Sequence, residues 1–210
     1  MIIITMILLN FSQRLYISFA IVGAIVVLLL TTILLYKNFY VKKRFKFIIG
    51  YILYRYSNLN DYLLRNEYRL HIDEKHIGQI DHVLITNKFI VTINDFSISG
   101  VISGDAFAEQ LKLTTKKGSK MINNPLNYNR NLTKRLAIFN NLDNSYLKGI
   151  TVVSDDAIIN IDNLRSQFRV CRKRDLKKVI KEFEQEDVKP FKEDTVVQFI
   201  NILDKNSVGE

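Results

Sequence analysis

The chain has 210 residues, of which 48% are hydrophobic and 24% are charged, and its formal net charge is +9. Only 8 Gly and 2 Pro stand beside 13 Phe and 10 Tyr, which excludes collagen-like, linker-like and disordered chains. The single cysteine, Cys171, excludes an intrachain disulfide and any metal site built from several cysteines. Its apolar surroundings predict a buried thiol in a reducing compartment.

An uncharged run of residues, 15–36, lies near the N-terminus. A helix of this length reaches about 33 Å at about 1.5 Å per residue, enough to cross a hydrocarbon core of about 30 Å. The run ends in a basic cluster rather than at a small-residue cleavage site, so we predict an uncleaved transmembrane helix. The buried core helix of a soluble protein is the alternative. Residues 1–14 then form a short apolar segment outside the cytoplasm.

The excess of positive charge is concentrated directly after this run. Residues 37–60 carry six Lys and Arg and no acid, whereas residues 61–210 carry 23 basic against 21 acidic side chains. This asymmetry predicts a single-pass protein of the cell membrane whose C-terminal part is cytoplasmic. We expect residues 37–47 to form a collar that contacts anionic membrane lipid.

Hydrophobic spacing predicts the first elements of the cytoplasmic part. Apolar residues three and four positions apart predict an amphipathic helix over 45–65. Runs of β-forming residues and turn signals predict strands, with a tight connection at 86–88. These strands are 68–72, 79–86, 89–93, a short one within 99–104, and 110–115.

Helical patterns return in the second half of the chain. Asn124-Pro125 opens a helix with Leu132, Leu136 and Phe139 on its inner face, and Asp175 caps another. The inward residues of the second helix are Leu176, Val179, Ile180 and Phe183. Strands at 149–154 and 168–171 and a short helix at 196–203 complete the pattern. Together the elements predict an α/β (α+β) fold, with one mixed sheet flanked by helices.

Three short blocks occur in a fixed order along this part of the chain. They are Gln79-Ile80-Asp81-His82-Val83, Ser99-Gly100-x-Ile102-x-Gly104 and Asn124-Pro125-Leu126. With them the chain resembles the nuclease-related domain family, a branch of the restriction-endonuclease-like nucleases, from His76 to Leu136 and more weakly from Gly50 to Phe183. The resemblance implies a nuclease-related domain at 48–185 with a restriction-endonuclease-like mixed sheet, followed by a C-terminal helix and tail at 186–210.

The resemblance also implies metal-assisted phosphodiester hydrolysis by an Asp, a Glu and a Lys on adjacent strands. Asp81 stands at the Asp position, but Asn94 stands at the Glu position and Phe96 at the Lys position. Tyr51 follows Gly50 where the family usually has a further glutamate. We therefore predict a catalytically inactive domain without a cofactor, in which Asp81 and Asn94 lie close together on neighbouring strands.

An active enzyme remains the alternative. It would be a Mg- or Mn-dependent DNA nuclease that uses Asp81 with Asp95 as a displaced second carboxylate. Because side chains alternate along a strand, Asp95 is expected on the face opposite Asn94, and only a bulge would reverse that.

An inactive relative would serve in nucleic-acid or protein interaction. The candidate contacts are Gln79, Lys116, Lys117, Lys120, Arg130, Arg172, Lys173 and Arg174. Basic residues at 165–181 are also typical of a solvated helix face, and acids at 182–187 follow them. A separate cluster of polar residues at 71–82 could bind zinc, although a polar connection between two strands explains this cluster better. It comprises His71, Asp73, Glu74, His76, Asp81 and His82.

Overall fold

The computed structural model describes residues 11–71, 77–164 and 167–206, and the chain divides into two compact units between Arg44 and Phe45. Helix α2 (Phe11–Asn60) contains this boundary. Its stretch Leu15–Ile33 has 19 residues and a mean hydropathy of 2.5, and none of it is buried. The helix is therefore long and apolar enough to cross a membrane, by length and composition.

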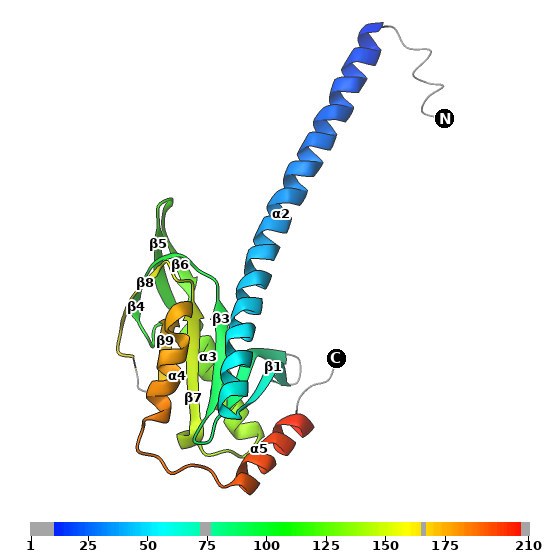
Figure 1. The fold of residues 1–210 in the computed structure, drawn as a ribbon. Helices are drawn as coiled ribbons and strands as arrows, with labels where there is room; N and C mark the ends of the chain where they lie inside the picture. The colour runs from blue at the N-terminus through cyan, green and yellow to red at the C-terminus, as the bar shows by residue number, and fades with distance from the viewer. Residues whose placement is uncertain (1–10, 72–76, 165–166, 207–210) are drawn as a thin grey trace. The chain divides into compact units, whose positions relative to one another are not determined.

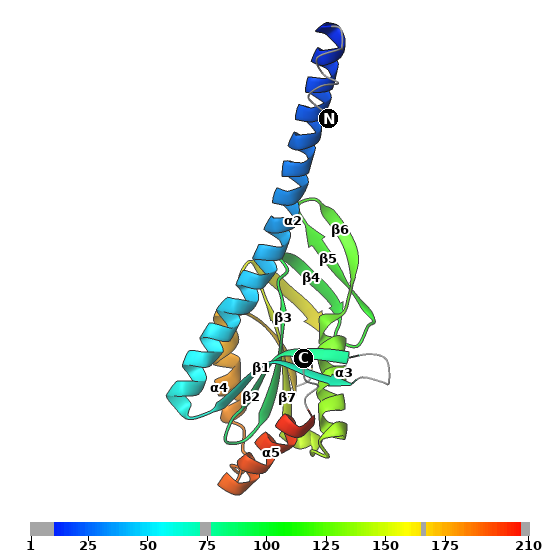
Figure 2. The same cartoon turned by 90° about the vertical axis from the view of Figure 1, so that its right-hand side faces the viewer.

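The second unit contains two mixed sheets (Figures 1 and 2). The first has the order β1–β2–β3–β7–β9, with β1, β2 and β3 antiparallel and β3, β7 and β9 parallel. The second has the order β6–β5–β4–β8, with β4 and β8 parallel. The strands are β1 (Leu63–His71), β2 (Ile77–Ile85), β3 (Ile90–Phe96), β4 (Gly100–Asp105), β5 (Gln110–Thr115), β6 (Gly118–Asn123), β7 (Leu147–Val153), β8 (Ala157–Asp162) and β9 (Phe168–Arg172).

These sheets confirm the predicted mixed α/β class but correct the expectation of a single sheet. The chain leaves the first sheet after Phe96 and enters the second at Gly100. Strands β6 and β8 were not predicted, because each lies at an edge of the second sheet and keeps exposed residues along its length. Helix α2 ends at Asn60 rather than at residue 65, and β1 starts at Leu63 rather than at residue 68.

Helices cover both faces of the first sheet (Figure 2). On one face, α2 from Phe45 onward and α4 (Leu176–Glu184) pack against β3 and β7 through residues such as Ile49, Ile93 and Phe183. On the other face, α3 (Pro125–Phe139) and α5 (Glu193–Asn206) pack against β1 and β2. Two short 3-10 helices, η1 (Asn144–Tyr146) and η2 (Lys173–Asp175), precede β7 and α4.

The Asn-Pro-Leu block has a capping function at α3. The Asn124 carboxamide oxygen accepts a hydrogen bond from the Leu126 N–H at 3.0 Å, and Pro125 occupies the first helical turn. Leu132 and Leu136 are buried as predicted, but Phe139 is 46% exposed because the helix ends there. The Asp175 side chain makes no capping bond and instead accepts from Arg172 Nε at 2.9 Å.

Gly100 is required by close packing in the second sheet. Its φ is +115°, and a Cβ at this position would lie 2.5 Å from the Thr114 carbonyl oxygen. A side chain would therefore strain the backbone and separate β4 from β5. This contact explains the glycine at the start of the second block.

Cys171 confirms the prediction of a buried thiol. It is 4% exposed in β9, and burial raises the pKa of the thiol to about 12. A thiol with so high a pKa is almost entirely protonated at neutral pH and is a poor nucleophile.

Candidate functional site

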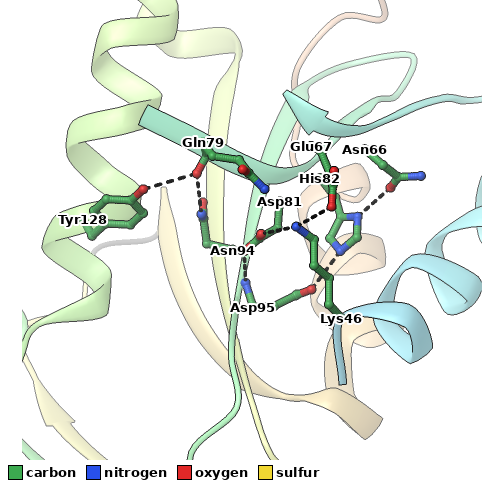
Figure 3. A network of polar contacts seen from close by, with 9 residues as sticks. All are labelled: Lys46, Asn66, Glu67, Gln79, Asp81, His82, Asn94, Asp95 and Tyr128. Atoms are coloured by element: carbon green, nitrogen blue, oxygen red, sulfur yellow. Dashed lines mark hydrogen bonds and ion pairs between the residues drawn. The ribbon is translucent and has the colours of Figure 1, made fainter. Parts of the chain in front are cut away.

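Lys46 lies at the centre of a polar network between α2 and the first two strands (Figure 3). Its Nζ is 3.0 Å from Glu67 Oε1 on β1 and 2.9 Å from Asp81 Oδ1 on β2. Burial lowers the pKa of Lys46, but hydrogen bonds with Asp81 and Glu67 outweigh burial and raise it overall. The hydrogen bond with Lys46 lowers the pKa of Glu67. The ammonium group is therefore held between two carboxylates.

Both carboxylate oxygens of Asp81 have partners. Oδ1 pairs with Lys46, and Oδ2 accepts a hydrogen bond from the backbone N–H of Asp95 at 2.9 Å. The pairing of His82 with Ile93 brings Asp81 on β2 and Asn94 on β3 to neighbouring positions. Their side chains bind different groups, because Asn94 Nδ2 donates to the Gln79 carbonyl oxygen at 3.3 Å. Tyr128 on α3 donates to the same oxygen at 3.4 Å.

His82 links this network to a buried carboxylate. Its Nε2 lies 2.9 Å from Asp95 Oδ2, and its Nδ1 lies 2.6 Å from Asn66 Oδ1. The side chains of His82 and Asp95 are 2% and 4% exposed. Burial raises the pKa of Asp95, although the hydrogen bond from His82 opposes the shift. The Asp95 carboxylate is thus bound to His82, on the side of β3 that faces α2.

The α2 helix reaches His82 because residue 50 is a glycine. A Cβ at Gly50 would lie 3.3 Å from His82 Cε1, which is tighter than most carbon contacts. Lys46 precedes Gly50 by four residues and shares its face of the helix. The following residue, Tyr51, is exposed.

Two oxygens of the network remain without a hydrogen bond. Asn94 Oδ1 and Asp95 Oδ1 are buried and meet no donor among the residues that the structure describes. Phe96, which the sequence resemblance aligns with the family lysine, is half-buried and packs against the apolar core of the second sheet. Residues 94 and 96 of β3 therefore supply an amide and an aromatic ring.

The described part of the chain does not bring together the polar residues that were weighed as a possible zinc site. Within residues 11–71, 77–164 and 167–206, no group of three His, Cys, Asp or Glu side chains is placed to hold a metal ion. Asp81 and His82 bind Lys46 and Asp95 instead. Asp73, Glu74 and His76 lie outside the described residues.

The predicted phosphate contacts come from separate parts of the fold. Lys116, Lys117 and Lys120 are exposed at and near the turn between β5 and β6. Arg130 on α3 lies over the Phe107 ring, at 4.4 Å from its centroid. Arg172 pairs with Asp175 at 2.9 Å, and Lys173 pairs with Asp155 at 3.0 Å. The backbone N–H of Arg174 also donates to Asp155. Gln79, the last predicted contact, is half-buried.

The nuclease-related domain model matches residues 43–154, just over half of the 210 residues. The chain belongs to the nuclease-related domain family. No curated relative and no solved structure shows significant similarity to it. The family match covers α2 from Lys43, both sheets as far as β7, and all of Lys46, Glu67, Asp81, His82 and Asp95. The resemblance carried by the three sequence blocks is thus confirmed.

Four members of this network, Lys46, Asn66, Glu67 and Tyr128, were not recognised from the sequence. Lys46 was grouped with the basic collar at 37–47, whereas the structure turns its ammonium group toward Glu67 and Asp81. Its spacing of four residues from Gly50 is the signal that could have separated it from Lys42 and Lys43. Glu67 has a φ of +56°, a backbone conformation that no sequence pattern around it indicated.

Proposed function

We propose that this nuclease-related domain is a membrane-anchored, cytoplasmic binding module without hydrolytic activity. The observation that supports the loss of activity is Lys46. Its ammonium group lies between Glu67 and Asp81, and Asp81 stands at the family's Asp position. A divalent ion at Asp81 would have to displace a cation that two ion pairs already hold.

The divalent metal that the family implies does not fit these residues. Hard cations need several oxygen ligands with negative charge, and Asn94 offers only a neutral amide. The remaining carboxylate, Asp95, is buried against His82. Phe96 cannot supply the positive charge that stabilises a transition state in such sites. We therefore derive no hydrolytic step for this chain.

Metal binding tests the role of Lys46 directly. Titration of Mn²⁺ into the full-length protein in a neutral detergent is expected to give weak or undetectable binding for the wild type. Lys46→Met removes the competing charge and is expected to strengthen Mn²⁺ binding by about tenfold or more, since a like charge at about 4 Å costs on the order of 1–4 kcal/mol. Asp81→Asn in the Lys46→Met background is the matched control and should abolish the gain. Tight Mn²⁺ binding by the wild type would contradict the proposal.

The membrane anchor is the second part of the proposal. It is supported by the apolar stretch Leu15–Ile33 and by the basic residues that follow it. A C-terminal tag should resist protease added to intact cells and be digested after the cells are permeabilised. Digestion in intact cells would place the nuclease-related domain outside.

The turn between β5 and β6 is the best candidate surface for a partner, and we favour nucleic acid. Lys112, Lys116, Lys117 and Lys120 are exposed there and form no ion pair with the described residues. When a protein binds phosphate groups, the logarithm of its affinity falls linearly with the logarithm of the salt concentration. Replacing Lys116 and Lys117 by Ala should therefore reduce both oligonucleotide affinity and its salt dependence. An affinity that depends neither on the salt concentration nor on these lysines would point to a protein partner.

A further inference from the structure

A basic groove lies between the end of α2 and α4, away from the network around Asp81. Its volume is about 730 Å³, and Tyr56, Leu59 and Asn60 form its α2 wall. The opposite wall carries four cations with Glu182 and Gln185 beside them. The cations are Arg174, Lys177, Lys178 and Lys181. We call this feature the α4 groove.

Arg174 of η2 and the three lysines of α4 form a row along one side of these consecutive helices. Their spacing of three, one and three residues places them on adjacent turns, over a length of about 10 Å at about 1.5 Å per residue. All four are exposed, and none forms an ion pair with the described residues. Like charges four residues apart destabilise a helix, so the row opposes folding of α4 unless a ligand neutralises it.

The acidic residues nearby neutralise the row only in part, because most of them pair with other residues. Glu182 pairs with Arg169 at 3.6 Å, and Glu184 accepts a hydrogen bond from the Tyr56 hydroxyl at 3.1 Å. Asp155 pairs with Lys173 and also accepts a hydrogen bond from the backbone N–H of Arg174, while Asp175 pairs with Arg172. The groove therefore keeps a concentrated positive charge that is available to an anion.

Acidic residues at the C-terminal end of the row limit the length of that anion. Asp175 lies within the row, between Arg174 and Lys177, and Glu182, Glu184, Glu186 and Asp187 follow the row in the sequence. A long nucleic-acid strand or a flat anionic membrane that extended beyond Lys181 would meet these acids. A volume of about 730 Å³ lies within the range of about 300–1,000 Å³ that is typical of small-molecule sites.

We propose that the α4 groove binds a small anion with a short chain of phosphate groups. Two sources share this chemistry, a nucleoside di- or triphosphate and an inorganic polyphosphate. The row of cations spans more than one phosphate, and exposed Leu59 offers an apolar surface to a nucleoside. This site is independent of the proposed function, because it shares no residue with the Asp81 network or with the β5–β6 turn.

Calorimetric titration of the full-length protein in a neutral detergent, with EDTA present, tests the groove. ATP or tripolyphosphate should bind one to one, with an affinity that falls as salt rises, and AMP should bind at least about tenfold more weakly. Lys178→Ala combined with Lys181→Ala should weaken binding by about tenfold or more, because charge-assisted hydrogen bonds are lost. Lys189→Ala combined with Lys192→Ala removes the same charge from exposed lysines outside the groove and should change nothing.

Leu59→Ala separates the two sources. If the groove accepts a nucleoside, this change should weaken the binding of ATP but not of tripolyphosphate. If the groove accepts the phosphate chain only, it should weaken the binding of neither ligand. The proposal is wrong if neither ligand shows saturable binding, or if the groove variant and its control behave alike. It is also wrong if oligothymidylate, or vesicles of phosphatidylcholine with phosphatidylglycerol, bind the same residues at least tenfold more tightly.

Discussion

Lys46 and the lysines of α4 use the same side chain in opposite ways. Lys46 is bound by two carboxylates of its own chain, within 3.0 Å of each. Lys177, Lys178 and Lys181 line the α4 groove and form no ion pair with the described residues. A cation that the fold neutralises contributes to structure and displaces other cations. A cation that the fold leaves unpaired remains available to a ligand.

The largest expected effect is on the buried pair next to Lys46. His82→Ala leaves the Asp95 carboxylate buried without its partner and should lower the free energy of unfolding by about 3–5 kcal/mol. Asp95→Asn should cost less, because burial disfavours the charged form of Asp95 and raises its pKa. Chemical denaturation in a neutral detergent, followed by tyrosine circular dichroism, measures both. Equal losses would show that His82 does not compensate a buried charge.

Lys46→Met should have the next largest effect. It leaves Glu67 and Asp81 as two nearby carboxylates without a cation, and we expect a loss of about 1–3 kcal/mol. The same denaturation experiment applies, with Lys42→Met as the matched control on an exposed residue of α2. A stability equal to that of the wild type would mean that the two ion pairs contribute nothing.

The pH dependence of Glu67→Gln sharpens the comparison further. The pKa of Glu67 is lowered from 4.5 in the folded state. Its contribution to the free energy of unfolding is therefore complete above pH 4.5 and is lost as the pH falls through the folded pKa. The pKa of Lys46 is raised from 10.5, so its contribution persists up to that pH and is lost above it.

Glu67 is about half exposed, and we expect a difference from the wild type of under about 1 kcal/mol at neutral pH. The difference should vanish in strong acid and in the Lys46→Met background. A difference that survives Lys46→Met would assign the effect to another partner.

The smallest expected effect is at α4. Lys178→Ala removes an unpaired, exposed charge and should change the free energy of unfolding by no more than about 0.5 kcal/mol. A small gain is the expected sign, since repulsion along the row decreases. Thermal denaturation at low and high salt measures it. A loss comparable to that of Lys46→Met would show that Lys178 has an internal partner and would remove the contrast.

The sequence was sufficient for the family, the mixed α/β class and the neighbouring positions of Asp81 and Asn94. Each of these follows from local signals, such as the Asn124 cap of α3 or the strand pattern around Asp81. The second sheet was missed because its edge strands have almost no buried residues: β6 has none, and β8 has only Ala157.

Lys46 could not be assigned from its neighbours in the sequence. It lies in a basic run in which Lys42, Lys43 and Arg44 are exposed, and its partners come from β1 and β2, at least 21 residues away along the chain. The backbone conformation of Glu67 has a positive φ, which the strand pattern gives no reason to expect. Long-range pairing of this kind requires the folded arrangement of α2 against the sheet.

The central claim is that this nuclease-related domain does not hydrolyse nucleic acid, and a cleavage assay tests it most directly. Purified full-length protein is incubated with linear and supercoiled DNA in Mg²⁺ or Mn²⁺, beside Asp81→Ala and beside the variant that combines Asn94→Glu with Phe96→Lys. We predict no cleavage above background by the wild type and none by Asp81→Ala, while the combined variant is the one in which activity could return. Metal-dependent cleavage by the wild type that Asp81→Ala abolishes would contradict the claim.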